Sequence, residues 1–237
     1  MTNPIQRMQG PLFDLMAFLT GRADIVTVII SFFSVAVIIL LVFPIHECAH
    51  GFMAKWLGDD TAEREGRLTL NPFDHIDPLG AFAMCLCCIG WAKPVPVNVR
   101  NCNKVKARTA LALTALAGPL ANIIMAYIIM IILKLMICFA PATYAVSVIM
   151  MALSYIVSIS IYLGIFNLLP IPPFDGYKIF YGIFPAKVTN FMDRNAQIIH
   201  WVFFALLIFG ILDVPLGFLS DCVWWLLDLL SGFIPAW

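Results

Sequence analysis

Two histidines and a glutamate at the end of a long apolar run are the residues whose types and spacing best suit chemistry. In His46-Glu47-Cys48-Ala49-His50 the histidines stand four positions apart, so on a helix both imidazoles lie on one face and can bind one Zn²⁺. Glu47 lies beside them as a general base that can take a proton from water. The preceding residues 25–43 carry no charge. This placement predicts a water-activating metal site inside a membrane and indicates hydrolysis of peptide bonds there.

The composition of the whole chain points to a membrane protein. Of 237 residues, 62% are hydrophobic and only 12% are charged, whereas soluble domains carry about 25% charged residues. A soluble core of this size cannot hide so much apolar surface, so we expect an all-α polytopic membrane protein in contact with the lipid bilayer. The formal net charge of zero gives no sign of nucleic-acid binding. The length fits a single intramembrane domain over residues 1–237.

Apolar blocks separated by polar loops outline the helices that must position the motif. Residues 25–43 are long enough to cross a hydrocarbon core about 30 Å thick, and we expect this helix to continue through both histidines to residue 57. Further apolar blocks lie at 110–133, 146–169, 198–212 and 216–234. The last two are either two short helices or one span and one interfacial helix. The pattern therefore predicts roughly four to six membrane helices.

An apolar segment too short to cross the membrane follows the first span. Residues 79–91 number only thirteen, which is typical of a re-entrant or surface-buried segment. Residues 93–99 alternate proline, valine and polar residues, a pattern allowed in an edge strand but not in a central one. We expect a short re-entrant, β-edge segment near the active site, where an unwound substrate could add as a further strand. The alternative is a membrane-surface loop without substrate contact.

The basic residues predict the orientation in the membrane. Eight of the fourteen Lys and Arg lie in residues 55–108 and three in residues 178–194, while Arg7, Arg22 and Lys134 fall on the opposite side. By the positive-inside rule, the two rich loops face the cytoplasm. The histidine-bearing helix then runs from outside to inside. We expect a multi-pass protein of the cell membrane with a submerged active site that faces the cytoplasmic side.

A catalytic zinc also needs a third protein ligand and one open position for water. His75, His200 and Asp175 are the candidates that stand out. Asp175 follows a proline-rich exit from residues 146–169, and because this span also runs outside to inside, it comes level with the histidine pair. Non-helical backbone at membrane depth is tolerated where it is buried or lines a wet cavity. A plain turn at the helix exit is the alternative reading of this carboxylate.

Taken together, the two motifs make the chain resemble the site-2 protease family of intramembrane zinc metalloproteases, in a short form without a PDZ or regulatory domain. The family pattern is HExxH on one span and N-x-x-P-x-x-x-x-D-G on a later one, which Asn167, Pro170, Asp175 and Gly176 fill. Stretches 66–72, 90–98 and 117–122 are also similar. The resemblance covers about residues 25–185, the catalytic core, with apolar C-terminal helices at about 196–237.

The resemblance implies a ligand set and a reaction. One Zn²⁺ per chain is bound by His46, His50 and Asp175, and Glu47 is the catalytic base. Asn167 lies near the site as a catalytic residue that orients substrate or stabilises the oxyanion. The implied activity is that of a zinc metalloendopeptidase that cuts within or near transmembrane segments of membrane proteins, known as regulated intramembrane proteolysis.

The resemblance also places Asn122 near the site, on a helix of its own. Two other functions use the same residues. A membrane metal transporter or metal-binding channel would use the ligands as a transit site and would not need Glu47 as a base. An inactive scaffold would need none of the chemistry, although all the ligands and the base are present in this chain. The sequence carries no sign of the oligomeric state.

Overall fold

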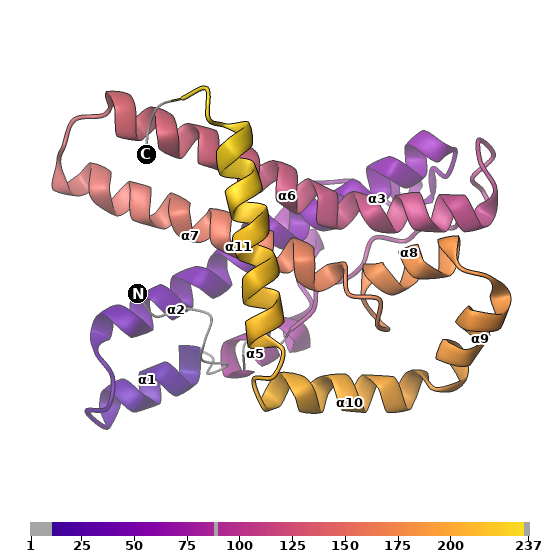
Figure 1. Ribbon diagram of the computed structural model, residues 1–237, viewed down its shortest axis with the longest axis horizontal. Coiled ribbons are helices and arrows are strands. Elements are labelled where there is room, and N and C mark those ends of the chain that lie inside the picture. The colour runs from indigo at the N-terminus through magenta and orange to yellow at the C-terminus, as the bar shows by residue number, and fades with distance from the viewer. Residues whose placement is uncertain (1–10, 88–89, 235–237) are drawn as a thin grey trace.

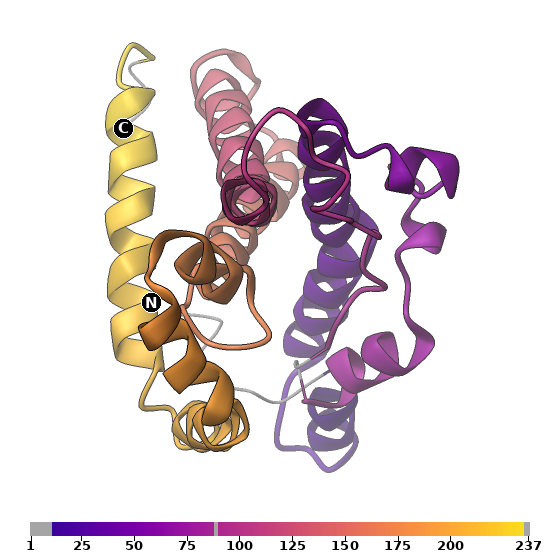
Figure 2. The same cartoon turned by 90° about the vertical axis from the view of Figure 1, so that its right-hand side faces the viewer.

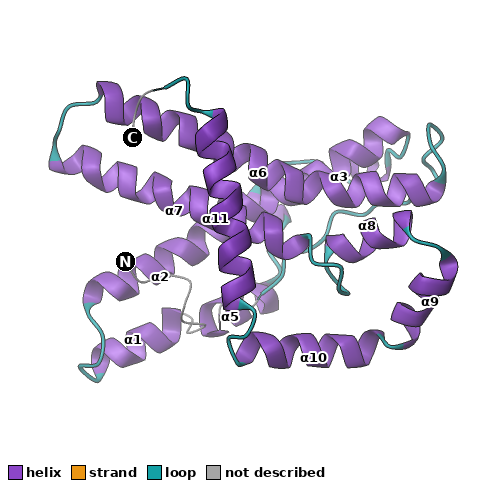
Figure 3. Cartoon of the chain, in the orientation of Figure 1, coloured by secondary structure: helices purple, strands orange, loops and turns teal. Residues whose placement is uncertain are grey.

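The computed structural model describes residues 11–87 and 90–234, and within these ranges it contains helices and no strand (Figures 1 and 3). The α-helices are α1 (Pro11–Leu19), α2 (Ile25–Val37), α3 (Phe43–Leu57), α4 (Thr61–Arg64), α5 (Pro78–Cys87), α6 (Ala107–Phe139), α7 (Tyr144–Asn167), α8 (Asp175–Ile183), α9 (Ala186–Arg194), α10 (Ala196–Ile208) and α11 (Asp213–Leu230). A π-helical segment η1 (Ile38–Val42) and a 3₁₀ turn η2 (Pro72–Asp74) complete the elements. The predicted all-α fold is confirmed.

Three helices in the described ranges are long and apolar enough to cross a membrane. They are the continuous helix Ile25–Leu57, then α6 and α7. Helices α10 and α11 pass the same test only as a pair, bent by 82°. The count is therefore three, or four if the bent pair is one span, which is at or just below the lower end of the four to six expected. The chain is a membrane protein, and the count depends on whether the two C-terminal helices act as one bent span.

A change of helical register precedes the HExxH motif in the first span. The Phe43 N–H donates to the Ile38 carbonyl, five residues back, instead of four. Pro44 comes next, at the start of α3, and has no N–H to continue the ladder. A π-segment of this kind inserts one residue into the helix and rotates the residues after it about the helix axis. The helix continues across the proline, as the sequence predicts, and the histidines lie within its next turns.

Helix α6 is the platform on which the site is built. It packs against α3, α7 and α8, and Figure 2 shows α6 and α7 between the first span and α11. Its buried residues include the small Ala115, Ala117 and Gly118, and Gly118 lies directly against both histidines of α3. Because lipid is as apolar as a leucine side chain, helices in a membrane associate mainly through close packing of such small residues. The sequence of α6 thus lets two backbones approach closely around the histidines.

The segment between α5 and α6 forms no regular strand in its described part, so the predicted β-edge is a loop. Only an isolated antiparallel bridge joins Ile76 to Ala92. The Lys93 and Pro94 carbonyls accept hydrogen bonds from the Arg67 guanidinium, and prolines at 94 and 96 remove two donors. The groups that a strand ladder would use are therefore engaged by side chains or missing. Helix α5, ten residues long, is too short to span, as predicted for residues 79–91.

A buried aspartate ties the end of α3 to the chain that leads into α6. Asp59 accepts hydrogen bonds from the backbone N–H groups of Thr61 (3.2 Å) and Asn98 (2.6 Å) and from the Asn101 amide (2.9 Å). Burial alone raises the pKa of Asp59, but these hydrogen bonds outweigh it and hold the pKa below its usual value. The folded protein therefore binds fewer protons here than the unfolded chain.

We expect Asp59→Asn to lower the thermal unfolding temperature at pH 7 by a few degrees, because charge-assisted hydrogen bonds contribute about 1.5–3 kcal/mol. A carboxylate with a lowered folded pKa stabilises the fold above about pH 4 and loses this contribution as the pH falls further. The gap between wild type and variant should therefore shrink below about pH 4 in detergent melts. Asp60→Asn, at an exposed surface pair with Arg64, is the control and should change little.

Candidate metal centre

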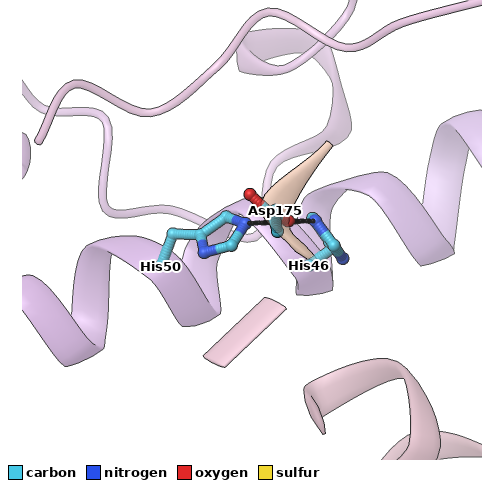
Figure 4. Close-up of side chains that lie close together, drawn as sticks. All are labelled: His46, His50 and Asp175. Carbon is cyan, nitrogen blue, oxygen red and sulfur yellow. Dashed lines mark hydrogen bonds and ion pairs between the residues drawn. The ribbon is translucent and has the colours of Figure 1, made fainter. Parts of the chain in front are cut away.

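Two helices bring three buried ligand side chains together. His46 and His50 reach from α3, and Asp175 is the first residue of α8 (Figure 4). All three are more than 90% buried. Helix α8 lies along α6 and is held there by Arg108, which donates to the Tyr181 and Phe184 carbonyls at the far end of α8. The loop between α7 and α8 therefore delivers Asp175 to the histidine face of α3.

The three ligand atoms form a nearly equilateral triangle. Asp175 Oδ2 lies 3.0 Å from both His46 Nε2 and His50 Nε2, and the two nitrogens are 3.1 Å apart. A tetrahedral zinc with bonds of about 2.0–2.1 Å requires its ligand atoms to be roughly 3.3 Å apart. The triangle therefore fits a zinc ion with only slight expansion, and the donor set of two imidazoles and one carboxylate is a catalytic zinc set.

The hydrogen bonds behind the histidines decide which ring atoms face the triangle. His50 Nδ1 lies 2.7 Å from the Thr114 carbonyl. A carbonyl only accepts, so Nδ1 carries the proton, and in the neutral ring Nε2 presents a lone pair. That lone pair faces the Asp175 carboxylate at 3.0 Å. Two such acceptors repel unless a cation, either a proton or a metal ion, is shared between them, so the arrangement itself fits cation binding.

The second oxygen of Asp175 is also occupied. Lys178, one turn further along α8, donates to Oδ1 at 3.0 Å. Burial alone raises the pKa of Asp175, but the two imidazoles and the Lys178 ammonium outweigh it and hold the pKa well below its usual range. Asp175 is thus a carboxylate at neutral pH and offers a single oxygen, Oδ2, to the triangle.

Two glycines allow the close approaches that the site requires. A Cβ at Gly118 of α6 would lie 2.4 Å from His50 Nε2 and 2.7 Å from His46 Cε1. A Cβ at Gly176 would lie 2.1 Å from the Leu168 carbonyl oxygen. Any side chain at the first position would enter the space of the imidazoles, and at the second it would block the loop that carries Asp175. The Gly in the Asp-Gly pair is thus explained by packing.

Glu47 lies at the edge of this site, against the loop that follows α5. Its Oε2 accepts a hydrogen bond from the Val95 N–H at 2.9 Å. Val95 is buried, and its side chain lies next to Gly51 on α3. The HExxH helix and the 93–97 loop are therefore in direct contact at the predicted catalytic base.

The two other histidines that the sequence offered as ligands lie outside the cluster. His75 is buried, with Nε2 bound to the Thr69 carbonyl, and His200 on α10 lies 3.4 Å from the Pro172 carbonyl. Asn167 ends α7, and its amide donates to the Leu163 carbonyl of its own helix; its role in catalysis stays a prediction. Asn122, by contrast, lies 3.2 Å from His46 Nδ1.

Lys178 and Gly118 are site residues that sequence reasoning missed. Lys178 counted only as a loop charge that determines orientation, and Gly118 only as part of a similar stretch. The signal for both was present in the spacing. A residue three positions after Asp175 shares its face of a helix, and a glycine among alanines opposite the histidines marks a close approach.

A family model and known proteins match the chain that carries this site. Residues 133–211 match the model of Peptidase family M50. The chain is also 38% identical to "Putative zinc metalloprotease YwhC" of Bacillus subtilis over 195 residues, which are 81% of this chain and 85% of that protein. The chain belongs to Peptidase family M50. The predicted membership of the site-2 protease family is thereby confirmed.

A second relative is more distant. The chain is 27% identical to "Putative zinc metalloprotease Rip2" of Mycolicibacterium smegmatis over 192 residues, or 80% of this chain and 71% of that protein. No solved structure matches the chain significantly. The part of this M50 chain matched by the family model includes Asp175 and lies outside the HExxH motif.

We expect Gly118→Ala to abolish metal binding at the cluster, because the new methyl group would overlap the His50 ring. Metal content after purification and a titration with Co²⁺ would measure it. Gly217→Ala on α11 is the matched control, since a Cβ there meets nothing within 4 Å. Wild-type metal binding in Gly118→Ala would contradict the geometry described here.

Proposed function

We propose that this M50 protein is an intramembrane zinc metalloprotease that hydrolyses peptide bonds within or near transmembrane segments of membrane proteins. The observation that carries the proposal is the buried triangle of His46, His50 and Asp175, whose two histidines lie on a membrane-spanning helix that also bears Glu47. Family membership supports a peptidase, and the names of both relatives support zinc.

The residues of the site suit a proton-transfer role around a bound metal. Zn²⁺ held by the triangle supplies a Lewis acid that makes water nucleophilic near neutral pH and stabilises charge on the scissile carbonyl. Glu47 takes the proton from the attacking water and delivers it to the leaving amine. The Val95 N–H holds Oε2, and among the described residues no hydrogen bond engages Oε1, which leaves this oxygen to carry the proton.

The loop at residues 93–97 is the proposed place for the substrate. A peptide bond inside a helix is shielded by its own hydrogen bonds, so a helical substrate has to unwind before attack. This loop contacts Glu47 directly through Val95, which puts a neighbouring extended peptide within reach of the base. The contact with Glu47 supports substrate binding here even though the loop is not a regular strand.

The proposed location is the cell membrane, with the site open toward the cytoplasmic side. Support comes from the basic residues, most of which lie in the loops at the ends of the first span and of α7. Single-span membrane proteins with an exposed end on that side are the proposed substrate class.

Glu47→Gln is the variant that tests the reaction. It should lower cleavage of a single-span substrate in detergent by about 10²–10⁴-fold, the usual contribution of general acid–base catalysis, while the zinc content stays near one per chain. Asp175→Ala should lose zinc, because it removes one of three ligands. Glu63→Gln, which breaks only the exposed pair with Lys55, is the matched control and should keep both zinc and cleavage.

Three outcomes would contradict the proposal. Cleavage by Glu47→Gln at the wild-type rate would exclude Glu47 as the base. Zinc binding by wild type without cleavage, together with zinc flux into liposomes, would indicate a transporter instead. Zinc binding with neither cleavage nor flux would indicate an inactive scaffold.

We expect Val97→Asp to reduce turnover at least several-fold without a change in zinc content, since a carboxylate in the proposed substrate loop disfavours an apolar substrate. Val97 is half-buried, so the side chain tolerates a polar replacement better than buried Val95. Val188→Asp on α9, at an exposed position, is the control for a new charge on an apolar surface. Equal turnover in wild type and Val97→Asp would remove the loop from the substrate path.

A further inference from the structure

A buried amide lies directly behind His46. Asn122 on α6 is 1% exposed, and its amide nitrogen is 3.2 Å from His46 Nδ1, the ring nitrogen that points away from the triangle. Its Oδ1 is buried and has no hydrogen-bond partner among the described residues. A buried amide end without a partner is costly in an apolar surrounding, so this oxygen calls for a physical explanation.

The two histidines have different kinds of hydrogen-bond partner at Nδ1. Behind His50 stands a backbone carbonyl, Thr114, which only accepts and therefore holds the proton on Nδ1. Behind His46 stands a side-chain amide, which has a donor end and an acceptor end. A half-turn about the Cβ–Cγ axis of Asn122 exchanges the two ends. Asn122 can therefore match either tautomer of His46, whereas Thr114 matches only one form of His50.

Metal binding by His46 requires one particular tautomer of its ring. Nε2 is the atom in the triangle, so a ligand His46 must carry its proton on Nδ1. The Nδ1–H then needs an acceptor, and the side chain that already contacts Nδ1 offers one, the unpartnered Oδ1 of Asn122 in the described part of the chain. With Oδ1 turned toward the ring, both histidines would donate from Nδ1 to an oxygen on α6.

We propose that Asn122 is the positioning residue of His46: its Oδ1 accepts the Nδ1–H and so selects the tautomer in which Nε2 is a metal ligand. This inference rests on the proposed metal centre and adds a residue to it. Helix α6 then orients both imidazoles of α3, one through the Thr114 carbonyl and the other through the Asn122 side chain. Gly118, midway between these two residues, leaves room for the rings. Loss of such a partner typically weakens metal binding by about 10–100-fold.

Zinc affinity, measured by competition with a chromophoric chelator, tests the proposal on the full chain in detergent. Asn122→Asp keeps an acceptor for the Nδ1–H and should bind zinc at least as tightly as wild type. Asn122→Leu has a similar size but no acceptor and should bind zinc about 10–100-fold more weakly. The absorption bands of bound Co²⁺ should shift in Asn122→Leu and keep their wild-type form in Asn122→Asp.

Met125→Ala is the matched control for packing. Met125 is buried on the same helix, one turn from Asn122, in a cluster with Val42 and Ile159, so its loss should lower thermal stability and leave zinc affinity unchanged. A merely structural role for Asn122 would instead make Asn122→Asp as harmful as Asn122→Leu, because it buries an unneeded charge.

The outcomes separate this inference from the proposed function. The proposed role of Asn122 would be overturned if Asn122→Leu bound zinc as tightly as wild type, or if both variants lost the same amount of zinc affinity. Zinc binding by the wild type would still support the metal centre in either case. Failure of the wild type itself to bind zinc would overturn both. If Asn122→Leu does not fold, the comparison of wild type with Asn122→Asp decides, since weaker binding by Asn122→Asp contradicts an accepting role.

Discussion

The contact on which the site depends is the mutual approach of three buried polar atoms. Asp175 Oδ2 and the Nε2 atoms of both histidines are 3.0–3.1 Å apart, and such a group is stable in an apolar region only where a proton or a metal ion is shared between its members. The surrounding residues keep these three atoms close together. Gly118 makes the room, Lys178 occupies the other carboxylate oxygen, and α6 lies behind both rings.

The need to hold these three atoms together explains how α3, α6 and α8 are arranged, whereas the number of spans does not. The histidines are four residues apart on one helix, so their spacing is local, but Asp175 comes from a helix far later in the sequence. Helix α8 must therefore be locked to α6, and the Arg108 contacts with the end of α8 provide this lock. The register change at η1, just before Pro44, determines which face of α3 turns toward α6.

The ligands were predictable from the sequence because their signals are short-range. HExxH requires only helical spacing, and Asp175 stands at the exit of an apolar span that comes level with it. The structure brings these three side chains together and places Asn122 beside His46, while their role as metal ligands stays a prediction. The predicted edge strand at 93–99 is wrong as a regular strand, since Arg67, distant in the sequence, occupies its carbonyls. The number of spans, three or four, is at or just below the lower end of the prediction, because hydropathy does not report the 82° bend between α10 and α11.

X-ray absorption at the zinc edge of the purified protein would show whether two imidazoles and one carboxylate of this M50 chain hold a single zinc ion. We expect one zinc per chain, surrounded only by nitrogen and oxygen at about 2.0–2.1 Å, with the scattering pattern of two imidazoles. Sulfur at about 2.3 Å would mean that cysteines bind the metal, and either that result or a lack of stoichiometric zinc would contradict the account.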